Sequence, residues 1–274
     1  LVVRRHSSMT TRSTPGNDDG SSAAESSENV LPFTLPKRIF DSKAVLKCVD
    51  CHAGGEPARV VLSGVPAFPP GCSTALLKRS YMMEHLDHLR KILMLEPRGY
   101  PCQNADFIFP PAANDENGNL QYVIAEQNKI YPLMSGHNTI CVATALLECG
   151  VVPMEEPISK FTLEAPAGPI EITAKCQQGK AQSISFRNAP SFVEHLDIVV
   201  NVPHENISVK LDVAYGGMWY AIVDMDQFQL EDSPIKLELD PSYGKQLCRI
   251  GEMIKVACRE QFPVQHPTED YPGV

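Results

Sequence analysis

Apolar and polar positions alternate along much of the chain from Ala44 onward, which is the pattern of half-buried strands. Two apolar stretches flank the loop at 52–57, where a glycine pair predicts a turn between two strands. Further strands are expected at 106–109, 122–126, 160–164, 170–174, 181–187, 197–200, 207–214 and directly after Gly216-Gly217. Most of the chain is therefore predicted to form sheets.

Three stretches have the spacing of helices. Leucines and methionines recur every three or four residues after Ser73, which predicts a helix from that capping serine to about Met94. The stretch 139–149 is apolar or small on nearly every face and is followed by Gly150, so we expect a helix that is buried all round. A last helix is expected at 243–260, with one apolar face.

Ser135, Gly136, His137 and Asn138 directly precede the buried helix. The first N–H groups of a helix have no partner within it, and in a buried helix they cannot reach solvent. This end of the helix is therefore a predicted site for an anion such as a substrate carboxylate. The same residues also fit a simple serine N-cap, and the pattern alone leaves both interpretations open.

The order of strand, glycine turn, strands and helix occurs twice, before and after about residue 158. We therefore predict two related α/β lobes at 44–158 and 159–274 with a cleft between them, the second lobe being incomplete at its C-terminus. Residues 1–43 are rich in Ser, Thr, Gly and acidic residues, which predicts a disordered tail. A cytoplasmic location is expected, with a mitochondrial one as the alternative because Arg4, Arg5 and Arg12 occur there without an early acid.

The charge balance bears on possible partners. The chain has 24 Lys and Arg against 33 Asp and Glu, a formal charge of −9, which argues against nucleic acid or a membrane surface as partner. The nine cysteines are too sparse for a disulfide scaffold, and a reducing compartment is the simpler interpretation.

Two motifs raise the question of a metal or haem. Cys48 and Cys51 precede His52 at the spacing of a haem attachment site, but on a strand two residues three apart point to opposite faces. His85 and His88 lie among charged residues, as on a solvated helix face. We expect neither motif to bind a metal, and no hydrolase elbow or nucleotide loop is present in the sequence.

Four sequence blocks, in this order, resemble the proline racemase family. They are VDCHAGGEPAR at 49–59, EPRG at 96–99, MSGHNTI at 134–140 and AYGG at 214–217. The resemblance implies a fold of the diaminopimelate epimerase type, with two pseudo-symmetric lobes, each a curled sheet around a central helix, and an active site between them. It also implies a proline or hydroxyproline substrate, no metal or pyridoxal cofactor, and two acid/base residues facing opposite sides of the substrate Cα. We allow for a homodimer.

The same resemblance assigns roles to the segment before the buried helix. Ser135 stands where racemases of the family have cysteine, and the N–H groups of Gly136, His137 and Asn138 would bind the substrate carboxylate. The second catalytic block of the family, Asp-x-Ser-Pro-Cys-Gly-Thr-Gly, is expected beyond Val274.

Serine is a weaker base than a thiol, whose pKa is about 8.5, so Ser135 disfavours efficient racemisation. We therefore expect dehydration of trans-3-hydroxy-L-proline to Δ1-pyrroline-2-carboxylate, which needs no reprotonation of the opposite face. The alternatives are a proline racemase or 4-hydroxyproline 2-epimerase and, from another class, a non-catalytic imino-acid binder or an inactive fragment.

Overall fold

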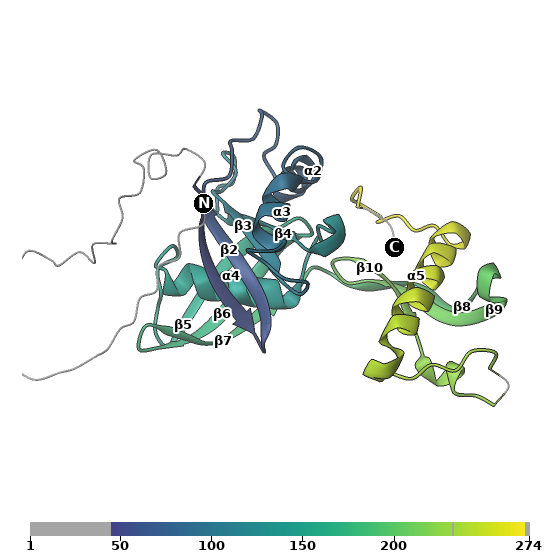
Figure 1. Ribbon diagram of the computed structural model, residues 1–274. Helices are drawn as coiled ribbons and strands as arrows, with labels where there is room; N and C mark the ends of the chain where they lie inside the picture. Colours follow the sequence, from purple (N-terminus) through teal and green to yellow (C-terminus); the bar gives the residue numbers. More distant parts are fainter. Residues whose placement is uncertain (1–44, 232, 272–274) are drawn as a thin grey trace, which may run out of the picture.

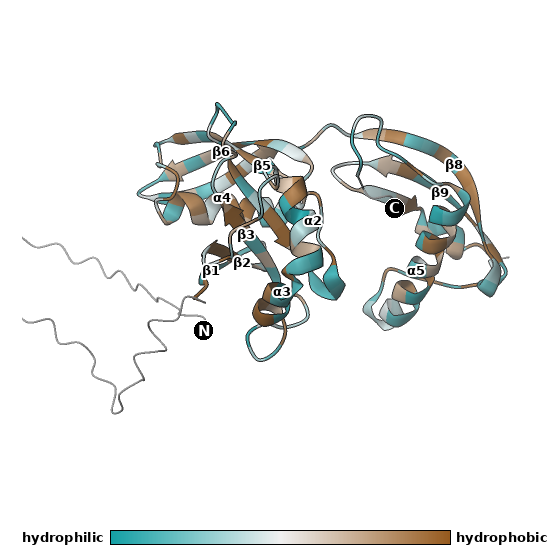
Figure 2. Ribbon diagram, turned by 90° about the horizontal axis from the view of Figure 1, so that it is seen from above, coloured by the Kyte–Doolittle hydropathy of each residue, from teal (hydrophilic) through white to brown (hydrophobic). Residues whose placement is uncertain are grey.

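The computed structural model describes residues 45–231 and 233–271, and the predicted tail at 1–43 lies outside them. The described residues form a mixed α/β fold with two sheets, joined by an extended segment after β7 (Figures 1 and 2). The prediction of a two-lobed α/β fold with a curled sheet is confirmed.

The larger sheet has seven strands that follow one another in sequence order. They are β1 Lys47–Ala53, β2 Glu56–Ser63, β3 Asn104–Phe109, β4 Leu120–Ala125, β5 Ile158–Ala165, β6 Gly168–Gln177 and β7 Lys180–Arg187. Neighbours pair antiparallel except β2 with β3 and β4 with β5, which are parallel. Helix α4 (Gly136–Glu148) contacts both edge strands, β1 and β7, so the sheet curls around it (Figure 1).

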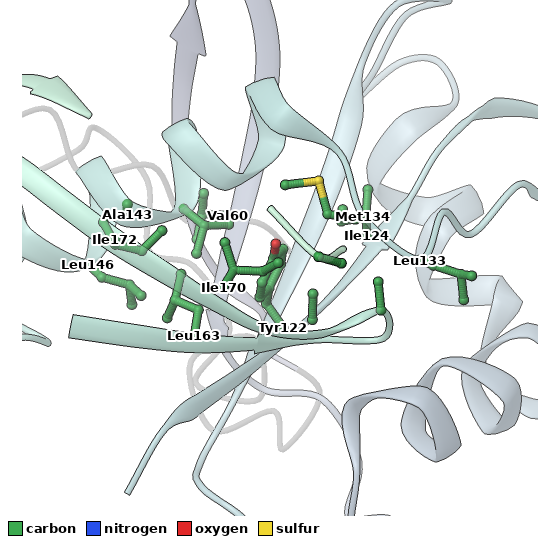
Figure 3. Close-up of a cluster of buried hydrophobic side chains, with 14 of the residues drawn as sticks. Val60, Tyr122, Ile124, Leu133, Met134, Ala143, Leu146, Leu163, Ile170 and Ile172 are labelled. Atoms are coloured by element: carbon green, nitrogen blue, oxygen red, sulfur yellow. The ribbon is translucent and has the colours of Figure 1, made fainter. Parts of the chain in front are cut away.

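The core of this lobe lies between α4 and the concave face of the sheet. Ala143 and Leu146 of α4 pack with Val60, Leu163 and Ile170 from the strands (Figure 3). The helix was predicted to be buried all round. Eight of its thirteen residues are buried and Glu148 at its end is exposed, so α4 is buried on most but not all of its faces. The opposite face of the sheet is covered by α2 (Ala75–His85) and α3 (Asp87–Met94).

The predicted single helix from Ser73 to Met94 is in fact these two helices. Leu86, with φ −120° and ψ 13°, interrupts the helix, and Thr74 rather than Ser73 caps it by accepting a hydrogen bond from the Leu77 N–H. The break allows each half to turn its own apolar side to the sheet, with Met82 buried from α2 and Leu93 from α3.

The smaller sheet contains β8 Phe192–Val202, β9 Ile207–Tyr215 and β10 Trp219–Val223, all antiparallel, in the order β10-β9-β8. Helix α5 (Gly244–Gln261) packs on it through Ile250 and Ile254. Short 3₁₀ turns lie at Gln127–Lys129, Pro203–Glu205, Met225–Phe228 and Pro241–Tyr243. The strands and the final helix follow the sequence prediction, with most strands longer than expected.

The predicted division at residue 158 is corrected by the strand pairing. Strands β5 to β7 belong to the first sheet, so the sheets divide between Arg187 and Phe192. The reason is that β5 pairs in parallel with β4 and buries Leu163 against α4. A parallel neighbour beyond a crossover helix leaves no local turn signal in the sequence.

Arg59 ties the first hairpin to the turn that follows α3. Its side chain is 3% exposed and holds Asp50 through two hydrogen bonds of 2.7 and 3.0 Å. It also donates to the carbonyl oxygens of Leu93 and Arg98, at 2.7 and 2.8 Å. One buried guanidinium thus satisfies the end of α3 and the turn at 96–99.

We predict that Arg59→Met lowers the free energy of unfolding by about 3 kcal/mol, because it removes the donor to the Leu93 and Arg98 carbonyls and the ion pair with Asp50. Urea denaturation followed by circular dichroism measures the change. Arg59→Lys is the control, and it should recover only part of the loss because an ammonium cannot reach three acceptors in a fork. Equal stability of the Met variant and the native protein would contradict this account.

Candidate active site

Ser135 lies at the N-terminus of α4 in an extended conformation, with φ −146° and ψ 128°. Its side chain makes no capping hydrogen bond to the helix backbone. The first turn is held instead through its carbonyl oxygen, which accepts from the Thr139 N–H at 3.0 Å and from the Thr139 hydroxyl at 2.7 Å. The hydroxyl of Ser135 is therefore not used as a simple N-cap.

The Ser135 hydroxyl oxygen is surrounded by hydrogen-bond donors. The Asn138 amide donates to it at 3.1 Å, and Nδ1 of His137 lies 3.4 Å away. Nε2 of His137 lies 3.1 Å from the Asn104 side-chain amide, and Nδ1 lies 3.4 Å from the Glu56 carboxylate. With Asn104 donating to Nε2, the proton of the neutral ring is assigned to Nδ1, facing Ser135 and Glu56. Because Oγ of Ser135 accepts these bonds, its own proton is available to another acceptor.

The backbone N–H groups of Gly136, His137 and Asn138 have no acceptor among the described residues. They are the unsatisfied donors of the first helical turn, at the positive end of the helix dipole. This combination binds carboxylates and phosphates without a charged side chain. The sequence-predicted segment is therefore gathered at one helix end, with the hydroxyl of Ser135 beside the free donors.

A pocket of about 490 Å³ lies at this helix end, and both lobes contribute to it. It is lined by Glu126, Ile130, Pro132, Met134, Ser135, Gly136, Phe186, Asn188, Gly216, Met218 and Tyr220. Ser135 and Gly136 reach the pocket directly, whereas Asn138 is fully buried behind it and His137 is not part of its wall. The candidate site thus lies between the lobes. The first lobe contributes the segment from Glu126 to Gly136 and Phe186 of β7, and the second lobe contributes the turn before β10 and Tyr220.

Two glycines shape the pocket. At Gly217, with φ +94°, a Cβ atom would lie 3.0 Å from Cβ of Met134, so the double-glycine turn approaches the first lobe more closely than another residue would allow. The Asn188 amide donates to the Gly216 carbonyl at 3.1 Å and holds that turn in place. At Gly136 a Cβ atom would lie 3.2 Å from the Phe186 ring, in the space beside the free N–H groups.

Three residues of the site, Glu126, Asn104 and Phe186, were not predicted from the sequence. Glu126 is the half-buried carboxylate of the pocket wall, and burial together with the nearby Glu56 carboxylate raises its pKa. Its signal in the sequence is weak, because it stands only as the first charged residue after an apolar strand. Asn104 and Phe186 reach the site through strand pairing, which no local pattern shows.

The motifs considered for metals lie elsewhere. Cys51 packs toward α4 and Cys48 toward α2 and α3, which confirms that the two thiols face opposite sides of the sheet. His85 and His88 are exposed. Across residues 45–231 and 233–271, no group of three or more His, Cys, Asp or Glu side chains is arranged to hold a metal ion. No helix in the same ranges is long and apolar enough to span a membrane.

Residues 48–274 match the family model described as proline racemase. The chain belongs to the proline racemase family. It is 35% identical over 225 residues to a 4-hydroxyproline 2-epimerase of Rhizobium etli and 34% identical over 225 residues to one of Agrobacterium fabrum. Each alignment covers 82% of this chain and 62% of the relative, so the chain spans less than two thirds of the length of these curated relatives.

Two solved structures share the fold. One is a hydroxyproline epimerase from Agrobacterium vitis with bound trans-4-hydroxy-L-proline, with a TM-score of 0.70 and 30% identity. The other is a probable proline racemase from Agrobacterium radiobacter with bound carbonate, with a TM-score of 0.70 and 33% identity. Each comparison covers 82% of this chain and 63% of the other. Membership of the family confirms the resemblance seen in the four sequence blocks.

We predict that Gly136→Ala weakens binding of pyrrole-2-carboxylate, a planar carboxylate, by about tenfold or more, because the added methyl group occupies the space between the helix N–H groups and Phe186. Titration calorimetry measures the dissociation constant. Gly251→Ala is the matched control, since a Cβ atom there meets nothing within 4 Å. Unchanged affinity in the Gly136 variant would show that the anion does not bind at this helix end.

Proposed function

We propose that this site takes part in cofactor-independent epimerisation of 4-hydroxyproline at its α-carbon. The observation that carries the proposal is the Ser135 hydroxyl, which lines a pocket between the lobes together with Gly136, at the helix end where three backbone N–H groups have no acceptor among the described residues. The family and the names of the curated relatives support epimerisation over the dehydration expected from sequence alone.

The chemistry follows from the charge that develops when Cα loses its proton. The electron pair moves into the carboxylate, which becomes enolate-like, and the N–H groups of Gly136, His137 and Asn138 would stabilise it where the carboxylate binds. Removing one such donor in other enzymes lowers kcat by about 10²–10³-fold. The helix end would thus bind the substrate and also lower the barrier.

Ser135 would face one side of Cα, as the acid in one direction of epimerisation and the base in the other. Its environment favours both roles, because Asn138 and His137 donate to Oγ and would stabilise the alkoxide that the base role requires. The opposite face needs a second acid/base group, and no thiol is present among the described residues that line the pocket. For that role we propose the cysteine of the second family block, which does not occur within residues 1–274.

Dehydration of trans-3-hydroxy-L-proline is the second candidate, and it is favoured by one observation. Oγ of Ser135 accepts hydrogen bonds from its neighbours, so its own proton can be donated to a departing β-hydroxyl group. In that reaction a single base removes the Cα proton. The product ring tautomerises to Δ1-pyrroline-2-carboxylate, which distinguishes the reaction from epimerisation.

We expect the protein in deuterated water to convert trans-4-hydroxy-L-proline to cis-4-hydroxy-D-proline with deuterium at Cα, measured by proton NMR. Ser135→Ala should lower this turnover by about 10²-fold or more, because a positioned acid/base group is lost. Ser135→Cys should retain activity. Ser183→Ala, which removes an exposed hydroxyl on β7, is the control and should be unaffected.

Parallel incubation with trans-3-hydroxy-L-proline separates the two candidates. If Δ1-pyrroline-2-carboxylate forms and the 4-hydroxy substrate is not inverted, the epimerase proposal is rejected in favour of the dehydratase. Turnover of neither substrate, together with binding of pyrrole-2-carboxylate, would favour a non-catalytic imino-acid binder.

A further inference from the structure

Two fully buried side chains near the candidate site carry acceptors without a donor. Asp106 on β3 is 0% exposed, and neither of its carboxylate oxygens has a hydrogen-bond partner among the described residues. Asn138 on α4 is also 0% exposed, and its Oδ1 has no partner within the same residues. Buried polar atoms are almost always hydrogen-bonded, so this pair requires an explanation.

The packing of α4 on β3 places these groups on facing surfaces. The contact between Asn104 and His137, at 3.1 Å, holds the first turn of the helix over the strand. Asp106 lies two residues further along the same face of β3, and its carboxyl group interacts electrostatically with Cys141. Cys141 follows Asn138 by three residues, so both occupy one side of α4. Asp106 therefore faces the side of the helix that carries Asn138.

All three unpartnered atoms are acceptors, and one proton on Asp106 would satisfy the pair. We propose that Asp106 is a neutral carboxylic acid that donates a hydrogen bond to Oδ1 of Asn138, directly or through one buried water, and thereby fixes the Asn138 amide with its N–H toward Oγ of Ser135. Asp106 would be a positioning residue that acts through Asn138. The effect of Asp106 on turnover rests on the proposed function of Ser135. The protonation state of Asp106 does not depend on that function.

The surroundings of Asp106 favour the neutral form. The titratable groups that act on it or respond to it are Cys51 on β1, Cys141 on α4, Tyr122 on β4 and Glu126 after β4, and none of them is a cation. Burial, and then Cys141 and Glu126, raise the pKa of Asp106 well above its ordinary value. Arg59 does not compensate, because its guanidinium is held by Asp50 and by two carbonyl oxygens.

The orientation of Asn138 has a chemical consequence. An amide can turn over and present either its oxygen or its nitrogen to Ser135. With oxygen toward Oγ, the serine would have to donate its proton to Asn138 and could not give it to the substrate. An O–H donor on the far side of the amide pairs with Oδ1 and thereby favours the orientation with N–H toward Oγ.

The protonation state is tested directly by carbon NMR of protein with labelled aspartate carboxyl groups, the Asp106 signal being assigned from its absence in Asp106→Asn. We expect a protonated carboxyl signal that does not titrate between about pH 5 and pH 8, above the range of an ordinary aspartate. A signal that titrates like an exposed aspartate would overturn the proposal. This measurement does not depend on turnover, so it decides about Asp106 even if the proposed reaction is wrong.

The positioning role is tested by two variants whose side chains have the same number of heavy atoms as aspartate. Asp106→Asn keeps a neutral donor and should retain kcat within about threefold, whereas Asp106→Leu removes the donor and should lower kcat about tenfold or more with little change in KM. Val123→Ala is the control for a general loss of stability, because it creates a cavity on the face of the sheet that points away from α4. This variant should leave kcat unchanged. Equal kcat in the Leu variant and the native protein would refute the role. Should the Leu variant fail to fold, loss of activity in a folded Asn variant would refute it as well.

Discussion

The candidate site depends on one constraint, which is the burial of the first turn of α4. A helix with a solvated N-terminus would have its free N–H groups covered by water, but here the curled sheet surrounds the helix and the pocket is left as the place where an acceptor can reach them. The apolar side chains of α4 fix this arrangement, because Val142 and Leu146 are packed between strands that come from both edges of the sheet. Donors held in place by the core need no rearrangement when a charge develops beside them.

The division of the pocket between two lobes follows from the same arrangement. The helix end supplies the donors and Ser135, while the second lobe supplies the glycine turn at 216–217, which approaches Met134 closely enough to exclude a side chain. The two sheets have separate apolar cores, and residue 271 contributes to both. The geometry of the site therefore depends on how the two lobes contact each other. Substrate binding at their boundary would in turn be coupled to that contact.

Local patterns in the sequence were sufficient for the parts of the fold that are local. The apolar run at 139–149 correctly predicted a helix buried on most of its faces. The anion site at its N-terminus was predicted from the adjacent polar residues and stays a prediction. The division at residue 158 was wrong because the pairing of β4 with β5 is a non-local contact. The break at Leu86 was missed because the continuous spacing of leucines and methionines hides which face each half turns to the sheet. Asn104, Asp106 and Glu126 were not singled out for the same reason, since each meets α4 or the pocket from a different strand.

The residue type at position 135 does not by itself decide the reaction. Serine is a poor base in water, and this property led from the sequence to dehydration. The structure changes the premise, because Oγ of Ser135 receives hydrogen bonds from two neighbours that would stabilise its ionised form. His137 is itself held by Asn104, and the Ser135 carbonyl is held by Thr139, whose hydroxyl is hydrogen-bonded to the buried Tyr122, so the core fixes the position of Ser135. A hydroxyl in that setting has a reactivity set by its partners, and the partners here are all donors. A serine in this position is therefore compatible with the epimerisation that we propose.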